Sequence, residues 1–511
     1  MKTAWLIFSS LFLQLIHLFA QHGVTPGWQS TVVPLPKVNP TYAAYTTVGS
    51  AVVVDKSGKI YVFYKEMDLN NPTTERIYIN TSSDGINWTP NIFPPAQNDK
   101  PGYYNVAIDT ANNIHVVWVK NSTGQLYYSK YDCNLSQWVI TNTIISNTVN
   151  ESIRGTSITV DRKMRVHVSW IDGQNDNSVN GEIMYRRSPD NGTTWDAQQN
   201  ISNTPGYPSC WQRSDFSGTF SDTLVYVWRE SVNPSGTNWD IMLAYSTNGG
   251  VSWQTRICST ASGHGQQRDP VSAVLKDNSI IIAYEDWPTN GYKKIYAGKS
   301  SNIVTTDPSF SQISDTVQSE LLIHGYDYKN NLYYAFWKWR YAAEAPNHMD
   351  IGGRFFDNNT QSWSNTNPSG GGVEWCTDIG SQSLGFKKCA IGPDGKVHLF
   401  YETPPGGISS IYYTYRSFPL TGISSSYLPP DNNLIIYPNP FSTQTILQTH
   451  KQLADATLTI TNIFGQTVEQ IKNIYGQRIT FSRGNLPCGL YFIRLTEENK
   501  TIAVDRLLIE N

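Results

Sequence analysis

The sequence is poor in charge and in cysteine, and after its first twenty residues it has no apolar run long enough to cross a membrane. Charged residues make up 15% of the 511 positions, the formal net charge is -3, and no run of Lys or Arg occurs. This pattern argues against nucleic acid or a polybasic membrane contact as a partner. The six cysteines form no Cys-x-x-Cys pair or His/Cys cluster, so we expect no zinc site. We expect no cofactor either, and a structural calcium ion stays an open alternative.

Residues 1–20 have the pattern of a signal peptide. Lys2 supplies the positive start, and an apolar run from Trp5 to Phe19 is followed by the small residue Ala20. Cleavage before Gln21 would release an exported chain without a transmembrane segment. A retained N-terminal anchor is the alternative.

Export would permit disulfide bonds. Cys210 with Cys258, and Cys376 with Cys389, are the pairs that we expect from their positions in the sequence. Spacing alone leaves the connectivity open.

A strand-like pattern recurs seven times: an aliphatic or β-branched run that ends in Trp or Tyr. The terminal aromatics lie 52 to 64 residues apart, at Tyr64, Trp118, Trp170, Trp228, Tyr284, Trp337 and Tyr401. Each copy follows another apolar run and a tight turn, and it precedes a third strand and usually a short fourth strand near a Trp. Four strands per unit without helical periodicity are typical of a propeller blade. The sequence therefore predicts an all-β fold with a seven-bladed β-propeller.

The seventh unit has no fourth strand of its own. The segment Gly27–Thr31 resembles Ser252–Arg256, which is the fourth strand of another unit. We therefore expect residues 27–35 to complete the last blade, so that the two ends of the propeller are joined and no sheet edge stays open.

The turn Ser188-Pro-Asp-Asn-Gly-Thr-Thr-Trp195 matches the Asp-box S-x-D-x-G-x-x-W, and Ser246–Trp253 and Thr81–Trp88 are looser copies. In such a turn Asp or Asn caps amides, Gly permits positive φ and Trp packs between strands. The motif resembles that of sialidase-like (BNR) propellers. We expect Asp190 to have this structural role rather than a catalytic one.

The composition changes near residue 421, where Ser-rich and Pro-rich sequence indicates a linker at 421–433 after a propeller at 21–420. Residues 434–511 contain Tyr437-Pro-Asn-Pro440, a turn before Gly465, and Gly489-Leu-Tyr-Phe-Ile-Arg-Leu495. In this order they resemble the type A sorting domain of the Bacteroidetes type IX secretion system, with Asn462 where that family usually has Asp. The resemblance implies a small β-sandwich, handling by that secretion machinery, and release or attachment at the cell surface.

Ligands of propellers usually bind where the first strands start and the second strands end, around the central channel. Arg154, Arg213 and Arg268 lie near the starts of three consecutive first strands, and Arg229 and Trp287 lie at ends of second strands. Guanidinium groups match carboxylate or sulfate, and Trp suits sugar rings. We expect these five residues to bind an acidic polysaccharide or glycoconjugate. The alternative is that the arginines pair with acids such as Asp215 or Asp269 and tie blades together.

Two groups of histidine are distinguished by position. His115, His167 and His398 occupy the same point within second strands, and this repetition indicates packing. His264, in a Gly-flanked loop that enters the fifth blade, and Tyr104 are the candidate catalytic acid/base residues.

Three functions fit these residues. Sialidases share the Asp-box, but their R-I-P motif is missing near the first blade and they have six blades. A polysaccharide lyase on a seven-bladed propeller, as in ulvan lyases, needs a cation against the uronate and a base for the C5 proton. Arg213 or Arg268, with His264 and Tyr104, would meet that need. A non-catalytic glycan-binding or adhesive propeller is the alternative to an enzyme.

Overall fold

The chain divides into two compact units, residues 1–418 and 419–511. The computed structural model describes residues 28–29, 33–45, 51–96, 99–147, 153–173, 181–217, 222–231, 238–259, 266–288, 291–314, 319–339, 350–364, 374–375, 387–403, 410–416, 434–462, 466–497 and 500–510. The expected signal peptide, the linker at 421–433 and His264 lie outside these residues. Within them, no helix has the length and apolar character needed to cross a membrane.

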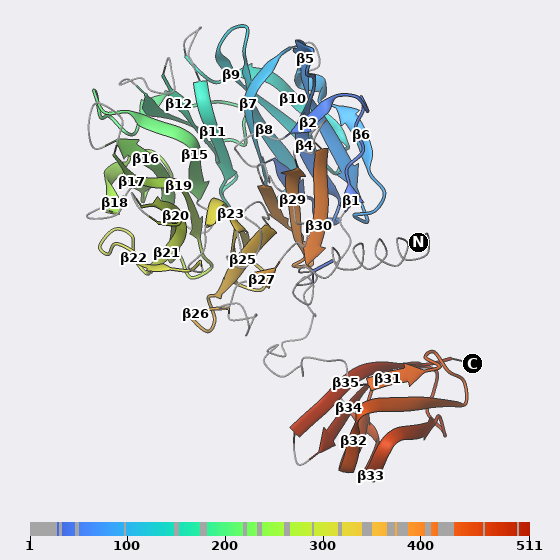
Figure 1. Cartoon of the computed structure of the whole chain (residues 1–511). Helices are drawn as coiled ribbons and strands as arrows, with labels where there is room; N and C mark the ends of the chain where they lie inside the picture. The colour runs from blue at the N-terminus through green and yellow to red at the C-terminus, as the bar shows by residue number, and fades with distance from the viewer. Residues whose placement is uncertain are drawn as a thin grey trace, which may run out of the picture. The chain divides into compact units, whose positions relative to one another are not determined.

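The described part of the first unit folds into seven antiparallel sheets, which confirms the predicted all-β propeller with seven blades. Figure 1 shows the sheets following one another around a ring from blue to orange. Blade 1 consists of β2 (Ala43–Tyr45), β3 (Val52–Val54), β4 (Ile60–Asp68), β5 (Asn71–Ser82) and β6 (Thr89–Ile92), and the 3-10 helix η1 (Pro94–Ala96) follows it. Blade 2 consists of β7 (Pro101–Ile108), β8 (Asn113–Lys120), β9 (Gln125–Asp132) and β10 (Gln137–Ile144). Blade 3 consists of β11 (Ile153–Val160), β12 (Val166–Asp172), β13 (Glu182–Ser188) and β14 (Gln199–Asn200).

The remaining blades repeat this order. Blade 4 consists of β15 (Ser209–Ser217), β16 (Leu224–Ser231), β17 (Trp239–Ser246) and β18 (Gln254–Ser259), and blade 5 of β19 (Gln266–Val274), β20 (Ile280–Trp287), β21 (Lys294–Ser300) and β22 (Ser309–Gln312). Blade 6 consists of β23 (Ser319–Asp327), β24 (Leu332–Trp339), β25 (Asp350–Asp357), β26 (Ser362–Trp363) and β27 (Glu374–Trp375). Blade 7 consists of β28 (Lys387–Ile391), β29 (Val397–Thr403), β30 (Ser410–Arg416) and β1 (Val33–Pro34).

The first strands of the blades form the inner wall of the ring. The strands β3, β7, β11, β15, β19, β23 and β28 each contact the next one in this order, and β28 contacts β3. We call these seven the inner strands. Because they run alongside one another, all of their starts lie at one end of the ring and all of their ends lie at the other.

The apolar core lies between blades. Seven clusters of buried side chains each combine residues of two consecutive blades, from blades 1 and 2 around to blades 7 and 1. The repeated aromatics are part of these clusters: Trp118, Trp170, Trp228 and Trp337 are at most 1% exposed. Each blade therefore buries both of its faces only when it has a neighbour on each side.

The ends of the propeller are joined as predicted. Val33 pairs with Tyr413 and Pro34 with Tyr412, and Trp28 forms an isolated bridge with Arg416. Figure 1 shows β1 beside β30. Blade 7 thus obtains its fourth strand from the start of the chain.

The Asp-box turns have the capping role predicted for them. Asp190 Oδ1 accepts a hydrogen bond from Thr194 N at 2.7 Å, and Ser188 Oγ accepts one from Gly192 N at 2.7 Å. The Thr194 amide lowers the pKa of the Asp190 carboxyl, with help from the Thr194 and Ser188 hydroxyl groups. Asp190 is therefore an ionised turn cap.

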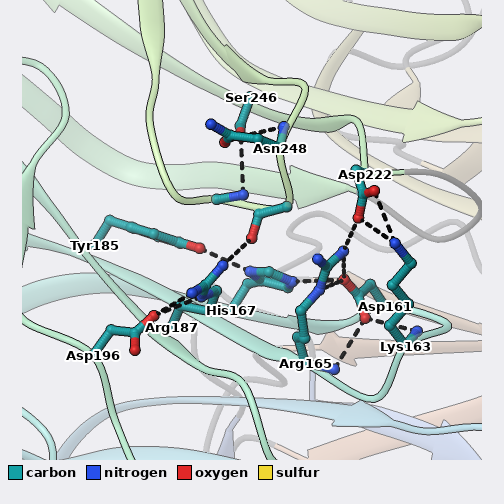
Figure 2. A network of polar contacts seen from close by, with 12 residues as sticks. Asp161, Lys163, Arg165, His167, Tyr185, Arg187, Asp196, Asp222, Ser246 and Asn248 are labelled. Carbon is teal, nitrogen blue, oxygen red and sulfur yellow. Dashed lines mark hydrogen bonds and ion pairs between the residues drawn. The ribbon is translucent and has the colours of Figure 1, made fainter.

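Each Asp-box turn also packs on a tyrosine of the preceding blade. The ring of Trp195 lies edge-on to Tyr128, with centroids 5.1 Å apart, and Trp253 lies in the same way on Tyr185 at 4.9 Å. A Cβ added to Gly250 would overlap the Tyr185 hydroxyl. Figure 2 shows this contact region, with Tyr185 reaching from its strand toward His167. Glycine is required here by close approach as well as by its φ of 83°.

The predicted disulfide between Cys210 and Cys258 is wrong, because Cys258 is a free thiol. Cys210 lies on β15 and Cys258 on β18, which are the first and last strands of one sheet. Three strand spacings separate them by about 14 Å, whereas a disulfide needs Cα atoms within about 7 Å. Cys389 is also a free thiol, so the predicted bond to Cys376 is not formed. Burial raises the pKa of the Cys258 thiol to about 12.

The second unit is a five-stranded antiparallel sheet with a core of its own. Its strands are β31 (Leu434–Tyr437), β32 (Gln444–Thr461), β33 (Thr467–Ser482), β34 (Gly489–Glu497) and β35 (Lys500–Ile509). The sheet order is β31-β32-β34-β35, and β33 pairs with β32 across several register shifts.

We predict that Gly250→Ala destabilises the propeller more than Gly206→Ala does. Both glycines have positive φ, 83° and 90°, so a Cβ strains the backbone at either position by roughly 1–2 kcal/mol. Only at Gly250 does the added atom also meet the Tyr185 hydroxyl, which adds about 1–3 kcal/mol of overpacking. Denaturant unfolding followed by tryptophan fluorescence measures the difference. Equal losses for both variants would contradict the packing role.

Candidate functional site

The two ends of the ring differ in which strand ends and turns they contain. We call the end where inner strands start and second strands end the mouth, and the end with the turns between these strands the turn face. Backbone pairs such as Gln266 with Trp287 and Ser319 with Trp339 lie at the mouth. The predicted site residues are on strands that begin or end there.

Two of the three predicted arginines occupy equivalent positions. Arg154 pairs with Ile171, and Arg268 pairs with Glu285; each partner directly follows a repeated aromatic. Arg213 does not share this position. It lies in an irregular stretch between Cys210 and Asp215, and Cys210 is the residue opposite Arg229.

The side chains of Arg154 and Arg213 lie outside the described residues, as does His264. The strands that carry Arg154, Arg213 and Arg268 are nonetheless consecutive inner strands that contact one another. The alternative role of these arginines, as ties between blades through Asp215 or Asp269, stays open.

Arg268 and Trp287 are brought together at the mouth of blade 5. The guanidinium carbon of Arg268 lies 3.9 Å from the centre of the Trp287 ring, and Lys293 Nζ lies 3.5 Å from it. Arg268 Nε donates a hydrogen bond to Gln266 Oε1 at 3.0 Å. Two cations are thus held on one aromatic ring by cation–π attraction. We call Arg268, Lys293 and Trp287 the blade 5 cluster.

The ring of this cluster is fixed by a carboxylate that also reaches the next blade. Trp287 Nε1 donates to Glu285 Oε2 at 3.0 Å, and Glu285 Oε1 accepts a hydrogen bond from Leu322 N at 2.8 Å. Glu285 is fully buried. The indole orientation is therefore set by hydrogen bonds to blade 5 and, through Glu285, to blade 6.

Lys293 is also positioned from blade 6. Its ammonium forms an ion pair with Glu320, and Lys338 Nζ lies 3.5 Å from Glu320 Oε1. Burial raises the pKa of the Glu320 carboxyl, but the hydrogen bond and charge of Lys293, together with Lys338, outweigh burial and lower it. Glu320 therefore stays ionised. The sequence analysis missed Lys293, whose position just before the third strand β21 places it at the mouth.

Arg229 is held inside blade 4. It is 6% exposed, and its guanidinium carbon lies 4.5 Å from the centre of the Trp239 ring. The neighbouring Glu230 accepts hydrogen bonds from Ser209 Oγ at 2.7 Å and Trp228 Nε1 at 3.1 Å. Burial raises the pKa of the Glu230 carboxyl. The side chain of Arg229 is thus buried against its own blade, and its predicted role in ligand binding stays a prediction.

Tyr104, the predicted catalytic tyrosine, lies in the core between blades 1 and 2. Its side chain is fully buried, and its hydroxyl donates a hydrogen bond to the Phe63 carbonyl oxygen at 2.9 Å. A group that takes a proton from a polymer must reach solvent. The structure therefore supports a packing role for Tyr104.

The repeated histidines have the packing role that the sequence indicated. His167 contacts the Tyr185 hydroxyl through Nδ1 at 2.8 Å and Asp161 Oδ2 through Nε2 at 3.1 Å, as Figure 2 shows. His115 makes the same two contacts with Tyr128 and Asp109 in blade 2. These chains connect a turn at the turn face to the tyrosine on which the next blade packs.

Metal binding has no support among the described residues, because these contain no group of three His, Cys, Asp or Glu side chains that could hold an ion. The expectation of a structural calcium ion is not tested by this observation.

The Tyr437-Pro-Asn-Pro440 motif of the second unit is hydrogen-bonded to the last strand, β35. Asn439 Nδ2 donates to the Arg506 carbonyl at 2.8 Å, and Asn439 Oδ1 accepts a hydrogen bond from Leu508 N at 2.8 Å. Phe441, which follows the motif, is 2% exposed in the core of this unit.

The family model described as "Secretion system C-terminal sorting domain" matches residues 435–510. The C-terminal unit is a sorting domain. It directs export by the type IX system to the cell surface or the extracellular space, as the sequence predicted. The match covers this domain and leaves the activity of the propeller open.

Comparison with solved structures finds similar chains at low sequence identity. A protein of unknown function from Dyadobacter fermentans DSM 18053 is 12% identical with a TM-score of 0.46, over 77% of this chain and 100% of that chain. The polysaccharide lyase Uly1 is 9% identical with a TM-score of 0.45, over 78% and 94%. The phage phi92 endosialidase is 11% identical with a TM-score of 0.43, over 94% and 87%. No curated protein matches the chain. Similarity at this level carries no argument about activity.

We predict that His398 makes the propeller less stable in acid. Burial and the charge of Lys396 lower its pKa to about 4, whereas an unfolded histidine titrates near about 6.5. Below that pH the unfolded chain takes up a proton that the folded chain refuses, so the free energy of unfolding falls between pH 6.5 and 4, by up to about 3 kcal/mol.

The matched variant is His398→Gln, which can still hydrogen-bond the Tyr413 hydroxyl that lies 2.8 Å from His398 Nδ1. Denaturant unfolding at several pH values should show the stability advantage of the wild-type protein shrinking as the pH falls. A constant difference from pH 7 to pH 4 would show that His398 has no depressed pKa.

Proposed function

We propose that this exported propeller is carbohydrate-directed and binds an acidic glycan at the mouth. The observation that carries the proposal is the blade 5 cluster, in which Arg268 and Lys293 lie over the ring of Trp287. An exported protein meets polysaccharides outside the cell, and a carboxylate or sulfate on a sugar is the anion that two clustered cations fit.

Two contacts orient the guanidinium of Arg268. Its carbon lies over the ring of Trp287, and its Nε donates a hydrogen bond to Gln266 Oε1. A planar fork held in one orientation can donate two parallel hydrogen bonds to a carboxylate. Trp287 is in this view a positioning residue for the two cations rather than a platform for sugar rings.

Catalysis at the same mouth, as a hydrolase or a lyase, is the further step that the sequence favours. A lyase needs a cation that neutralises the uronate carboxylate and a base that removes the C5 proton. Arg268 supports the first requirement. The predicted base, His264, lies outside the described residues, and Tyr104 is buried. Acidic-glycan binding is therefore the function that the geometry supports best, and a non-catalytic binder stays the alternative to an enzyme.

We predict that Arg268→Ala weakens binding to polygalacturonate, ulvan or polysialic acid by about tenfold to a hundredfold, because a hydrogen bond to a charged group contributes about 1.5–3 kcal/mol. Lys293→Ala should add to the loss, and so should Arg213→Ala if that side chain joins the site. Isothermal titration of the full chain against each polysaccharide measures the effect.

The matched control is Arg256→Ala on the outer strand of blade 4, where Arg256 Nε donates to Asp307 at 2.9 Å. This variant should bind as the wild type does. Unchanged affinity in the Arg268→Ala, Lys293→Ala double variant would overturn the proposal.

The same polysaccharides distinguish the three activities. New reducing ends together with ultraviolet absorbance of an unsaturated product would identify a lyase, and new reducing ends without that absorbance a hydrolase. Binding with no product would identify a non-catalytic glycan-binding protein.

A further inference from the structure

Strand β34 of the second unit is apolar on both of its faces. Tyr491, Ile493 and Leu495 belong to the core of this unit. The residues between them point to the opposite side of the sheet, where Leu490 is 39% and Phe492 is 40% exposed. A strand with one face in solvent normally alternates apolar and polar residues. The second apolar face of β34 is therefore not explained by the core.

The outward residues of β34 and β35, which are neighbours in the sheet (Figure 1), lie next to one another because of the strand register. Leu490 is directly opposite Leu508, which is 40% exposed, and Phe492 is directly opposite Arg506. Arg494 follows Phe492 by two residues on the same face. Residues in these relations lie about 5 Å apart across the strands and about 7 Å apart along one strand. We call Leu490, Phe492, Leu508, Arg494 and Arg506 the outer patch of the sorting domain.

The outer patch is positively charged as well as apolar. Arg494 and Arg506 are exposed. Within the part of the chain that the structure describes, their side chains form no hydrogen bond, ion pair or ring contact. The patch thus combines two positive charges with three exposed apolar side chains.

The groups beside the two arginines do not offset their charge. On the neighbouring strand β32, Thr459 is opposite Arg494 and Thr461 is opposite Phe492, so this side of the patch is uncharged. Asp505 precedes Arg506 in the chain but is opposite Ile493, so it lies on the core-facing side of the sheet. The outward face therefore attracts an acidic partner.

The sorting function of this unit indicates what kind of molecule covers the patch. A domain that directs export has to be bound by a protein of the export machinery, and the family match leaves open which surface is used. The motif Gly489–Leu495 supplies core residues at its odd positions and Leu490, Phe492 and Arg494 of the outer patch at its even positions. Two arginines beside apolar residues fit a protein surface, whereas a surface of anionic lipid attracts clusters of four or more basic residues.

We propose that the outer patch is the surface by which the export machinery recognises this domain, and that the partner is a protein surface of apolar residues flanked by Asp or Glu. Contact would bury Phe492 and the pair Leu490 and Leu508, and the two guanidinium groups would pair with carboxylates. The proposal concerns the second unit alone and does not depend on the glycan site at the mouth.

The first test identifies the partner directly. Phe492 is replaced by the photo-crosslinking residue p-benzoylphenylalanine in the full chain, which is produced in a Bacteroidetes host with an active type IX system. Irradiation should link position 492 to a protein of that system, identified by mass spectrometry. Tyr475 is 66% exposed on β33, which pairs with neither β34 nor β35. The same crosslinker at Tyr475 should give about tenfold less of this product.

The second test measures export of full-chain variants. Leu490→Thr with Phe492→Thr removes apolar surface, and Arg494→Glu with Arg506→Glu reverses the charge. Each pair should lower the fraction of the chain that reaches the cell surface or the medium by about tenfold, because central anchors and charge complementarity determine recognition. Arg494→Lys with Arg506→Lys keeps both charges and should be exported as the wild type is.

Arg478→Glu is the matched control for charge reversal. Arg478 is exposed on β33 and is opposite Gln448, in the part of β32 that does not pair with β34. This variant should be exported normally. Denaturant unfolding of each purified chain checks that the fold is retained, since exposed strand positions tolerate threonine.

Normal export of both the threonine pair and the glutamate pair would show that the patch is not a recognition surface, and so would an equal loss in Arg478→Glu. Crosslinking of position 492 to a lipid, to a second copy of the chain or to its own propeller unit would also contradict the proposal. If the lysine pair failed as severely as the glutamate pair, an acidic partner would be ruled out.

Discussion

Burial of apolar surface between neighbouring blades is the constraint on which the rest of the structure depends. A four-stranded sheet has two faces, and here each face is covered by the sheet next to it, so that seven clusters are shared by consecutive blades. The chain can bury both faces of every blade only by closing into a ring, because the first and last sheets would otherwise expose one face and one edge. The pairing of Val33 with Tyr413 provides that closure.

Closure also separates the two ends of the ring. At the turn face the same aspartate, histidine and tyrosine contacts occur in blades 2 and 3, and in both blades the tyrosine contacts the Asp-box turn of the next blade. At the mouth the inner strands are irregular. Register shifts follow Arg154, Arg268 and Glu320, and such bulges redirect the side chains beside them. The variable end is therefore where charged groups gather, and it is where the blade 5 cluster lies.

The sequence-based predictions were most successful for interactions within one blade or between adjacent blades. The repeated aromatics, the Asp-box caps and the packing role of His115, His167 and His398 were predicted correctly, because each depends on a pattern that recurs within a blade or between adjacent blades. The predicted Cys210–Cys258 bond is wrong, while ligand binding by Arg213 and Arg229 stays a prediction. A bulge shifts Arg213 out of register, a neighbouring Trp covers Arg229, and a sheet four strands wide separates the two cysteines.

The sequence by itself determined the number of blades, the joining of the N-terminal segment to the last blade and the export address, since all three are written in repeats and motifs that act locally. Only the tertiary structure decided which cations share an aromatic ring. Arg268 and Lys293 meet on Trp287, from positions 25 residues apart in the chain. Such meetings depend on strand register and on ring closure, neither of which a linear pattern contains.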